Sequence, residues 1–255
     1  MTYPTLSGRT AVVTGAASGI GAATARLLAA SGAAVALLAR REERLKDLAA
    51  RIAAAGGRAV AVAADVTDQE SVDAAAARIR AELGAVDLVV NNAGVMLPNP
   101  LQDGRTDEWT RMIDTNLTGV LRVTRAFGDD LRAVGGRGGT ADLVNISSIA
   151  SHIAFPNYGV YSATKAAVTQ LSASLRGEFG PQGVRVTNIE PGLTDTELGD
   201  HIDNPELGLD GQLGGMFQQI GPIAATDVAD LVGYAASRPS HVNLRQLIVL
   251  PTRQA

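Results

Sequence analysis

Apolar residues fall into short continuous runs that alternate with longer alanine-rich stretches of helical period. Seven runs of β-prone residues stand at 10–14, 35–38, 59–63, 86–90, 141–145, 184–189 and 247–250. Because these runs are apolar at nearly every position instead of at alternate ones, we expect strands that are buried on both faces. The pattern predicts an α/β fold with a seven-stranded parallel sheet and helices on both of its faces.

One domain is predicted for the whole chain, because no change in composition and no long linker divides residues 1–255. The glycine-rich patch at 135–139 is expected to be a loop before the fifth strand. The alternation stops at 194–221, where the residues are rich in Gly, Asp and Leu. We expect this stretch to be a mobile lid over a binding site or an ordinary surface excursion.

Composition narrows the classes of partner. The chain is 46% hydrophobic with a formal net charge of −4, and it has no basic stripe, so nucleic acid is not expected as a partner. Cys is absent, and the three histidines, at 152, 201 and 241, lie far apart, so no metal site is expected. No leader-like or membrane-spanning run is apparent, so we expect a cytoplasmic protein that does not contact a membrane.

A glycine-rich loop joins the first predicted strand to the first predicted helix. Residues 14–21 read Thr-Gly-Ala-Ala-Ser-Gly-Ile-Gly. Glycine permits a tight turn, and a helix N-terminus offers free N–H groups and a positive dipole end to a pyrophosphate. The alternative is a plain turn, but this position favours a dinucleotide site. The contacts expected there are Gly15, Ser18, Gly19, Ile20 and Gly21.

Two arginines follow the second predicted strand. An acidic residue at this point would accept hydrogen bonds from a ribose 2′-hydroxyl, but the chain has Ala39, Arg40 and Arg41. A guanidinium can bind a 2′-phosphate through a charge-assisted bidentate contact. The sequence therefore favours NADP(H) over NAD(H), with Arg40 as the main contact; the alternative is a pair of solvated arginines at a helix start.

Two further strand ends point to the same ligand. Asp65 and Val66 follow the third strand, where the carboxylate can meet the adenine amino group, cap a helix, or do both. Asn92, Ala93 and Gly94 follow the fourth strand. We expect them against the cofactor, because ligands of such sheets bind at the carboxyl ends of the strands.

Tyr161 and Lys165 stand one helical turn apart and share a helix face. An ammonium about 4 Å from a phenolate contributes roughly 4 kcal/mol at an effective dielectric near 20, enough to lower a tyrosine pKa from about 10 by up to about three units. We therefore expect Tyr161 to act as an acid near neutral pH. A helix with Tyr and Lys at this spacing usually has no catalytic role. Whether this pair is catalytic is therefore judged from the other motifs of the sequence.

Those neighbours are Asn116, Ser148 and Pro191-Gly192, in order with the motifs above. With them the chain resembles a short-chain dehydrogenase/reductase over essentially all its length. Segments 109–116 and 189–198 and the terminal Pro251-Thr252 are similar to a bacterial subgroup that includes clavulanate dehydrogenase and NADP-dependent 3-hydroxy acid (serine) dehydrogenases. The resemblance implies hydride transfer between NADP(H) and a carbonyl or alcohol.

Catalytic roles are implied by this resemblance for four residues, Asn116, Ser148, Tyr161 and Lys165. Tyr161 would be the general acid of reduction and the base of oxidation, and Ser148 would bind the carbonyl oxygen. Lys165 would lower the Tyr161 pKa and bind the nicotinamide ribose, while Asn116 would hold a water in a proton relay.

Two neighbouring residues are alternative candidates for the roles of Ser148 and Tyr161. Ser147 competes with Ser148, but the spacing to Tyr161 favours Ser148, and Ser147 would point away on the alternating backbone. Tyr158 competes with Tyr161, but it has no lysine four residues later.

The segment at 191–196 resembles the part of the family that meets the nicotinamide carboxamide. The remaining expected cofactor contacts are Ile146, Pro191, Gly192, Leu193, Thr194 and Thr196. Before them, Glu190 replaces the common Asn of Asn-Pro-Gly, and a buried structural acid is one interpretation.

Substrate contacts are expected from loop residues near these motifs, namely Met96, Leu97, His152, Phe155, Asn157, Tyr158 and Leu193. Most of them are apolar or neutral. His152 could meet a carboxylate or polar head, or be a partly exposed loop residue. No arginine stands ready for a carboxylate, which argues against a simple 3-hydroxy acid.

Small residues along 161–179 allow close helix packing, and such helices build homotetramers in this family, so a tetramer or dimer is expected. Other functions stay open: a non-catalytic NADP-binding regulator, a 3-hydroxy acid dehydrogenase of narrow specificity, and a dehydratase or epimerase. The intact catalytic set argues against the regulator. The short excursion argues against the dehydratase or epimerase, whose relatives tend to carry a distinct sugar-nucleotide domain.

Overall fold

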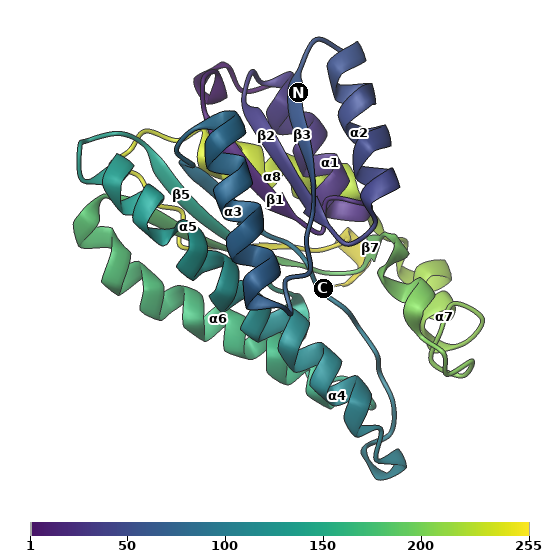
Figure 1. The fold of residues 1–255 in the computed structure, drawn as a ribbon. Coiled ribbons are helices and arrows are strands. Elements are labelled where there is room, and N and C mark those ends of the chain that lie inside the picture. The colour runs from purple at the N-terminus through teal and green to yellow at the C-terminus, as the bar shows by residue number, and fades with distance from the viewer. Residues whose placement is uncertain (1, 255) are drawn as a thin grey trace.

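The sheet has seven parallel strands in the order β3-β2-β1-β4-β5-β6-β9 (Figure 1). The computed structural model describes residues 2–254. The strands are β1 (Thr10–Thr14), β2 (Ala34–Ala39), β3 (Arg58–Ala63), β4 (Leu88–Asn91), β5 (Ala141–Ile146), β6 (Val184–Pro191) and β9 (Gln246–Val249). All seven predicted strands and the single α/β domain are confirmed. From β1 the chain adds β2 and β3 on one side, and then β4 and the later strands on the other side. Folds of this type bind ligands at the point between β1 and β4 where the strand order reverses.

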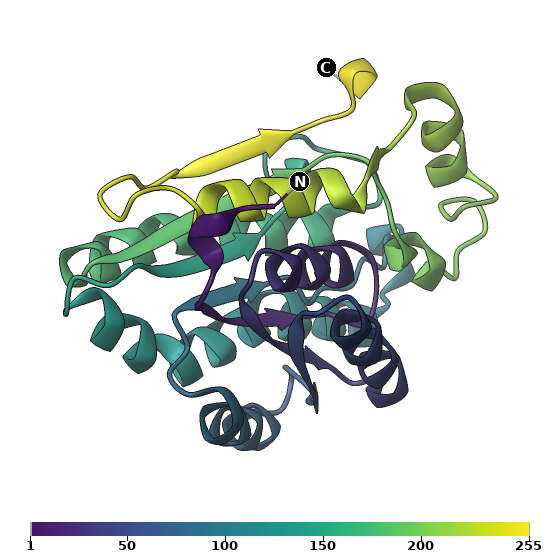
Figure 2. The same ribbon diagram turned by 90° about the horizontal axis from the view of Figure 1, so that it is seen from above.

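Helices cover both faces of the sheet, because each buried strand presents apolar side chains alternately to either side (Figures 1 and 2). One face, with Val13 and Leu37, packs against α1 (Gly19–Ala30), α2 (Glu42–Ala54) and α8 (Ala225–Ala236). The other, with Val12 and Leu38, packs against α3 (Gln69–Leu83), α5 (Gly119–Gly135) and α6 (Gly159–Phe179). The two apolar layers hold the strand ends in fixed positions.

Between α4 (Thr106–Ile113) and α5 lies one π-helical turn, Asp114–Thr118. Six short 3-10 helices complete the described connections, at Pro4–Leu6, Leu101–Asp103, Ile149–Ser151, Gly180–Gln182, Glu197–His201 and Thr252–Gln254. The last lies beside α7 (Gln212–Ile220), as Figure 2 shows.

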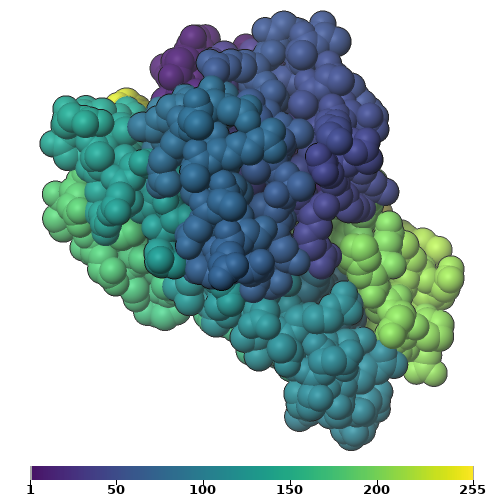
Figure 3. Space-filling model, in the orientation of Figure 1, coloured from purple at the N-terminus to yellow at the C-terminus, as the bar shows by residue number. Residues whose placement is uncertain are grey.

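The excursion after β6 starts and ends in a small parallel sheet. It is formed by β7 (Thr194–Asp195) and β8 (Ile223–Ala224), which are too short for a sequence pattern to predict. Between them, Glu197–His201 and α7 form a lobe that projects from the body (green in Figure 3). An ion pair of 2.7 Å between Arg105 and Asp203 joins this lobe to the start of α4.

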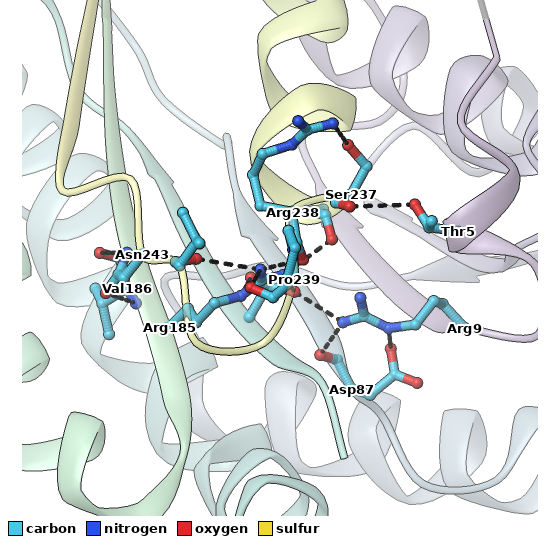
Figure 4. Close-up of polar contacts among 12 residues, drawn as sticks. Thr5, Arg9, Asp87, Arg185, Val186, Ser237, Arg238, Pro239 and Asn243 are labelled. Atoms are coloured by element: carbon cyan, nitrogen blue, oxygen red, sulfur yellow. Dashed lines mark hydrogen bonds and ion pairs between the residues drawn. The ribbon is translucent and has the colours of Figure 1, made fainter. Parts of the chain in front are cut away.

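An ionic network ties the strands together at the amino edge of the sheet, opposite their carboxyl ends (Figure 4). Arg9 pairs with Asp87 at 2.6 Å and with Asp142 at 2.9 Å, and Arg185 pairs with Asp142 at 2.8 Å. Arg185 also donates to backbone carbonyls at the end of α8 and after it, including that of Pro239. Asp142 is buried, and a buried carboxylate is stable only when its charge is compensated. The guanidinium groups of Arg9 and Arg185 provide that compensation.

No helix in residues 2–254 is long and apolar enough to cross a membrane.

Candidate active site

A cavity of about 360 Å³ lies at the carboxyl ends of the central strands. Most residues that the sequence predicted for the site line it: Gly15, Ser18, Gly19, Ile20, Arg40, Arg41, Asp65, Val66, Asn92, Ala93, Gly94, Met96, Ile146, Ser148, Phe155, Tyr158, Tyr161, Lys165, Pro191, Gly192, Leu193, Thr194 and Thr196. Gly21, Leu97, Asn116, His152 and Asn157 are not part of the lining. Leu97 is instead buried in the apolar cluster that contains Met96. Asn157 has a positive φ angle of 73°, and its carbonyl accepts from the Asn99 N–H at 3.0 Å.

The glycine loop contains backbone conformations that residues other than glycine rarely adopt. Gly15 and Gly19 have positive φ angles of 66° and 50°. A Cβ atom on Gly21 would lie 2.4 Å from the Gly15 carbonyl oxygen and 2.6 Å from Nδ2 of Asn92, so Gly21 permits close packing behind the loop without lining the cavity. The first turn of α1 has no side-chain cap. The loop therefore fits a pyrophosphate, whose oxygens would accept from the open N–H groups.

The two arginines after β2 differ in their partners. Arg41 donates to Ser18 Oγ at 2.8 Å and to Glu197 at 2.9 Å, and Arg44 also pairs with Glu197. Arg40 lines the cavity, and its guanidinium forms no hydrogen bond or ion pair with any residue from 2 to 254, although its backbone carbonyl accepts from the Glu42 N–H at 3.1 Å. Its guanidinium is thus the freer of the two for an incoming phosphate.

Asp65 stabilises its own turn and does not cap α3. Its carboxylate accepts from the N–H and hydroxyl of Thr67 at 2.9 and 2.8 Å, whereas the helix cap is Asp68. Burial acts to raise the Asp65 pKa, but these hydrogen bonds and the charges of Arg40 and Arg122 outweigh it and the pKa lies below its usual range. Asp65 is therefore a charged acceptor at the wall of the cavity.

Ser147 and Ser148 diverge at the end of β5. The Ser147 hydroxyl donates to the Lys165 carbonyl at 2.8 Å and lies 3.0 Å from the Thr169 hydroxyl. Both partners belong to α6, so this hydroxyl is used in packing that helix against the sheet. Ser148 Oγ accepts from the Ala150 N–H at 3.1 Å, and the Ser148 side chain acts to lower the pKa of Tyr161. The geometry thus joins Ser148, and not Ser147, to the tyrosine.

Tyr161 and Lys165 lie on the first turns of α6, and each is only 6% exposed. The Lys165 ammonium donates to the Ile146 carbonyl at 3.0 Å and lies 5.8 Å from the centre of the Tyr161 ring. Burial raises the pKa of Tyr161 to about 12, although the Ser148 side chain acts in the opposite direction. Burial also lowers the pKa of Lys165 to about 8. The expected fall in the Tyr161 pKa is wrong for this structure, because desolvation of the buried phenol is the dominant influence on it.

Asn116 lies in the π-helical turn and not in a regular helix. Its side chain donates to the Val95 carbonyl at 2.9 Å and to Thr164 Oγ1 at 3.1 Å, and it accepts from the Val95 N–H at 2.8 Å. A Cβ on Gly94 would lie 3.3 Å from Asn116 Oδ1 and 3.6 Å from Lys165 Nζ. Asn116 therefore fixes the loop after β4 from behind, close to Lys165.

One part of the lining is apolar and includes residues that the sequence reasoning missed. Beside Met96 and Phe155, it contains Leu213, Met216 and Phe217 from α7. The rings of Phe155 and Tyr158 meet edge to face, with centres 6.1 Å apart. Apolar residues at helical spacing within 213–220 are the signal that could have identified α7 as a wall of the site.

Tyr158 carries a buried hydroxyl that has no hydrogen-bond partner in the part of the chain described. Its side chain lines the cavity, and burial raises its pKa.

His152 does not contact the cavity, contrary to the prediction. Its Nε2 atom lies 2.8 Å from Glu190 Oε2. Glu190 is fully buried, so this carboxylate is the structural acid that the sequence left open. Its other hydrogen-bond donors are Ser151, Thr169, Asn188 and Gln246. His152 Nε2 is thus bound to a structural carboxylate and not directed at a substrate in the cavity.

The segment after β6 is held by local hydrogen bonds. Leu193 donates its N–H to Gln254 Oε1 at 2.7 Å, and the Thr194 hydroxyl donates to the Gly192 carbonyl at 2.9 Å. Thr196 caps the 3-10 helix at Glu197–His201. No group of three or more His, Asp or Glu side chains among residues 2–254 could hold a metal ion.

Comparison with known proteins gives a consistent result. The family model for short chain dehydrogenases matches residues 9–206. Sulfoacetaldehyde reductase 2 of Chromohalobacter salexigens is 38% identical over 96% of this chain and 94% of its own. Serine 3-dehydrogenase of Agrobacterium fabrum is 36% identical over 96% of this chain and 95% of its own.

Solved structures agree with the sequence relatives. The closed form of serine dehydrogenase complexed with NADP+ superposes with a TM-score of 0.82 at 31% identity, covering 94% of each chain. An alcohol dehydrogenase from the archaeon Thermococcus sibiricus, complexed with 5-hydroxy-NADP, gives a TM-score of 0.84 at 30% identity, covering 97% of this chain and 98% of its own.

Proposed function

This chain belongs to the short-chain dehydrogenase family of oxidoreductases, and from that premise we propose that it is an NADP(H)-dependent enzyme of the carbonyl reductase or alcohol dehydrogenase type. The observation that carries the proposal is the meeting of Ser148, Tyr161 and Lys165 in one buried corner of the cavity. A proton donor, a second hydroxyl and a cation are the groups that reduction of a carbonyl requires.

The cofactor preference is supported by charge. The end of β2 has no carboxylate to repel a 2′-phosphate, and the unpaired Arg40 would bind it. The glycine loop would hold the pyrophosphate, Asp65 would meet the adenine, and Lys165 would bind the nicotinamide ribose. Two solved relatives, at 30% and 31% identity, are complexes with an NADP analogue and with NADP+. When bound, the reduced nicotinamide supplies the hydride.

The protonation state of Tyr161 suits reduction. With a pKa of about 12, the phenol keeps its proton at neutral pH, as a proton donor must. Ser148 would donate to the carbonyl oxygen and stabilise the negative charge that develops there. Asn116, next to Gly94 and Lys165, would support a proton relay from solvent.

The lobe at 194–221 is proposed to be a mobile lid, because its α7 lines the cavity while its contacts to the body include the exposed Arg105 ion pair. The homotetramer or dimer and the cytoplasmic location stay predictions from the sequence.

Replacing Tyr161→Phe tests the mechanism, since it removes only the hydroxyl. We expect turnover of NADPH with aldehyde and ketone acceptors to fall by about 10²- to 10⁴-fold, while NADPH binding, followed by its fluorescence, stays within about twofold. The matched control is Tyr234→Phe, which removes the hydroxyl of an exposed tyrosine on α8 that does not line the cavity and should retain turnover. Retained turnover in Tyr161→Phe would overturn the mechanism. NADPH binding by the wild type without turnover of any acceptor would favour the non-catalytic regulator.

A further inference from the structure

The cavity has two chemically different ends. Its nucleotide end carries Ser18, Arg40, Arg41 and Asp65. Its other end, beside Tyr161, has what we call the apolar wall, formed by Met96, Phe155, Tyr158, Leu193, Leu213 and Met216. This wall belongs to a hydrophobic cluster distinct from the two that pack the sheet. A substrate carbonyl placed at Tyr161 would therefore have its substituents against apolar and aromatic side chains.

Positive charge is scarce at this end. Among the described lining residues, the only arginines are Arg40 and Arg41 at the nucleotide end, and the only lysine is Lys165, whose ammonium is bound to the Ile146 carbonyl. The remaining basic side chain of the lining is His201, which is exposed at the end of the 3-10 helix in the lobe. A carboxylate or sulfonate against the apolar wall would lose its hydration without gaining a guanidinium or ammonium partner.

We infer that the substrate is a carbonyl compound with an uncharged, apolar alkyl or aryl substituent, or the corresponding alcohol, and not a small anionic aldehyde or hydroxy acid. This inference rests on the proposed function and specifies its substrate class. It separates this chain from relatives whose names state an ionic substrate, sulfoacetaldehyde or serine. The apolar wall selects by desolvation, since it accepts methylene groups and penalises charge.

Two pairs of acceptors isolate the charge from the reactivity of the carbonyl. Hexanal is compared with 6-oxohexanoate, and octan-2-one with 7-oxooctanoate; in each pair a terminal methyl group is replaced by a carboxylate several bonds from the carbonyl. With NADPH, we expect kcat/KM to favour the neutral member of each pair by about tenfold or more.

A positive charge placed in the apolar wall should weaken this preference for the neutral member. Met216 is partly exposed on α7, so Met216→Lys can extend an ammonium into the cavity without burying it completely. We expect this variant to reduce the neutral-to-anionic ratio of kcat/KM by about tenfold, whereas Met216→Leu, the matched apolar control, should keep the wild-type ratio. His201→Gln should also keep it, because the inference assigns no anion to His201.

Binding gives a second readout that does not depend on turnover. Trp109 is the only tryptophan of the chain, and it packs against the cluster that contains the apolar wall. Titrating each acceptor into the protein with NADP+ should change the Trp109 fluorescence at lower concentration for the neutral member of each pair.

The outcomes separate the inference from the function on which it rests. Turnover that is equal or faster with the anionic members would overturn the inference and leave the proposed function intact, and loss of such a preference in His201→Gln would assign the anion to His201. Tighter binding of the neutral members, with no turnover of any of the four compounds, would support an apolar site and overturn the proposed reductase.

Discussion

Replacing the buried carboxylate Glu190→Gln should destabilise the protein and slow catalysis together. The Glu190 side chain has no exposed surface and, within residues 2–254, no arginine or lysine partner, so neutral and imidazole donors surround its carboxylate. The five donors come from the 3-10 helix after β5 and the residue that follows it, from α6, β6 and β9: Ser151, His152, Thr169, Asn188 and Gln246. The carboxylate therefore connects the residues just after Ser148 to the edge of the sheet.

The expected loss of stability follows from the replacement of a charged carboxylate acceptor by a neutral amide. Hydrogen bonds to a charged group contribute about 1.5–3 kcal/mol each and neutral ones about 0.5–1.5 kcal/mol. In the amide, Oε1 can keep its three bonds in weaker form, but the new NH₂ group would face the donor of Gln246, which lies 2.7 Å from Oε2 in the wild type. Because burying an amide costs less than burying a carboxylate, part of the loss is offset. We expect a net loss of about 2–4 kcal/mol, which corresponds to a fall in Tm of roughly 4–16 °C in a chain of this size.

Thermal unfolding followed by circular dichroism measures the first effect, and kcat with NADPH and hexanal measures the second. We expect kcat to fall by about tenfold, because the loop that follows Ser148 is held less firmly to the sheet when the bonds of Ser151 and His152 to residue 190 weaken. The control is Glu178→Gln, the same chemical change on an exposed carboxylate of α6, which should shift stability by less than about 0.5 kcal/mol. A Glu190→Gln variant that melts and turns over like the control would refute this reasoning.

Three further predictions concern charge. Arg40→Ala should weaken NADPH binding by about tenfold or more and leave NADH binding within about threefold, as measured by cofactor fluorescence; equal losses would refute the assignment of the 2′-phosphate. Burial lowers the pKa of Lys165 from its usual 10.5 to about 8, so the folded protein binds fewer protons than the unfolded chain between these values and gains stability as pH rises through them. Lys165→Met should therefore be more stable than the wild type at neutral pH by up to about 3 kcal/mol, with a margin that shrinks towards alkaline pH; a margin independent of pH would contradict the buried charge. Asp142→Ala should lose about 3–5 kcal/mol in chemical denaturation, because it leaves two buried guanidinium groups without their shared carboxylate. Wild-type stability of this last variant would show that the amino-edge network contributes little.

The fold could be predicted because strands that are buried on both faces of the sheet give short apolar segments in the sequence. Most strands of the large sheet are nearly continuous apolar runs, although β5 and β6 also carry buried polar residues such as Asp142 and Arg185. The predicted bounds lie within two residues of those in the structure. The strands β7 and β8 left no such trace, since each has only two residues and pairs with a partner 29 positions away in the chain, as Thr194 does with Ile223. A sequence period needs more residues than that to be visible.

The site was predictable where chemistry depends on order along the chain, and not where it depends on packing. The family resemblance of the ordered motifs implied roles for Ser148, Tyr161 and Lys165, and all three line one cavity. The Tyr161 pKa was misjudged, because a Coulomb estimate for an isolated pair omits the desolvation that burial imposes. The partners of Glu190 could not be found from sequence, because they range from Ser151 to Gln246 and form no local pattern.

The pairing of β7 with β8 brings the two ends of the excursion together, so the chain leaves the main body and returns to it at nearly the same place. Seen from the body, the intervening residues are a closed loop, and the entropy of closing such a loop rises by only about 0.6 kcal/mol for each doubling of its length. Insertions, deletions and exchanges between Thr196 and Pro222 can therefore accumulate in evolution, or be grafted in the laboratory as a cassette, while the hydroxyl groups of Ser148 and Tyr161 stay in position. Changes in the excursion can therefore alter which substrate binds, while Ser148 and Tyr161, which are proposed to carry out the reaction, lie in the main body.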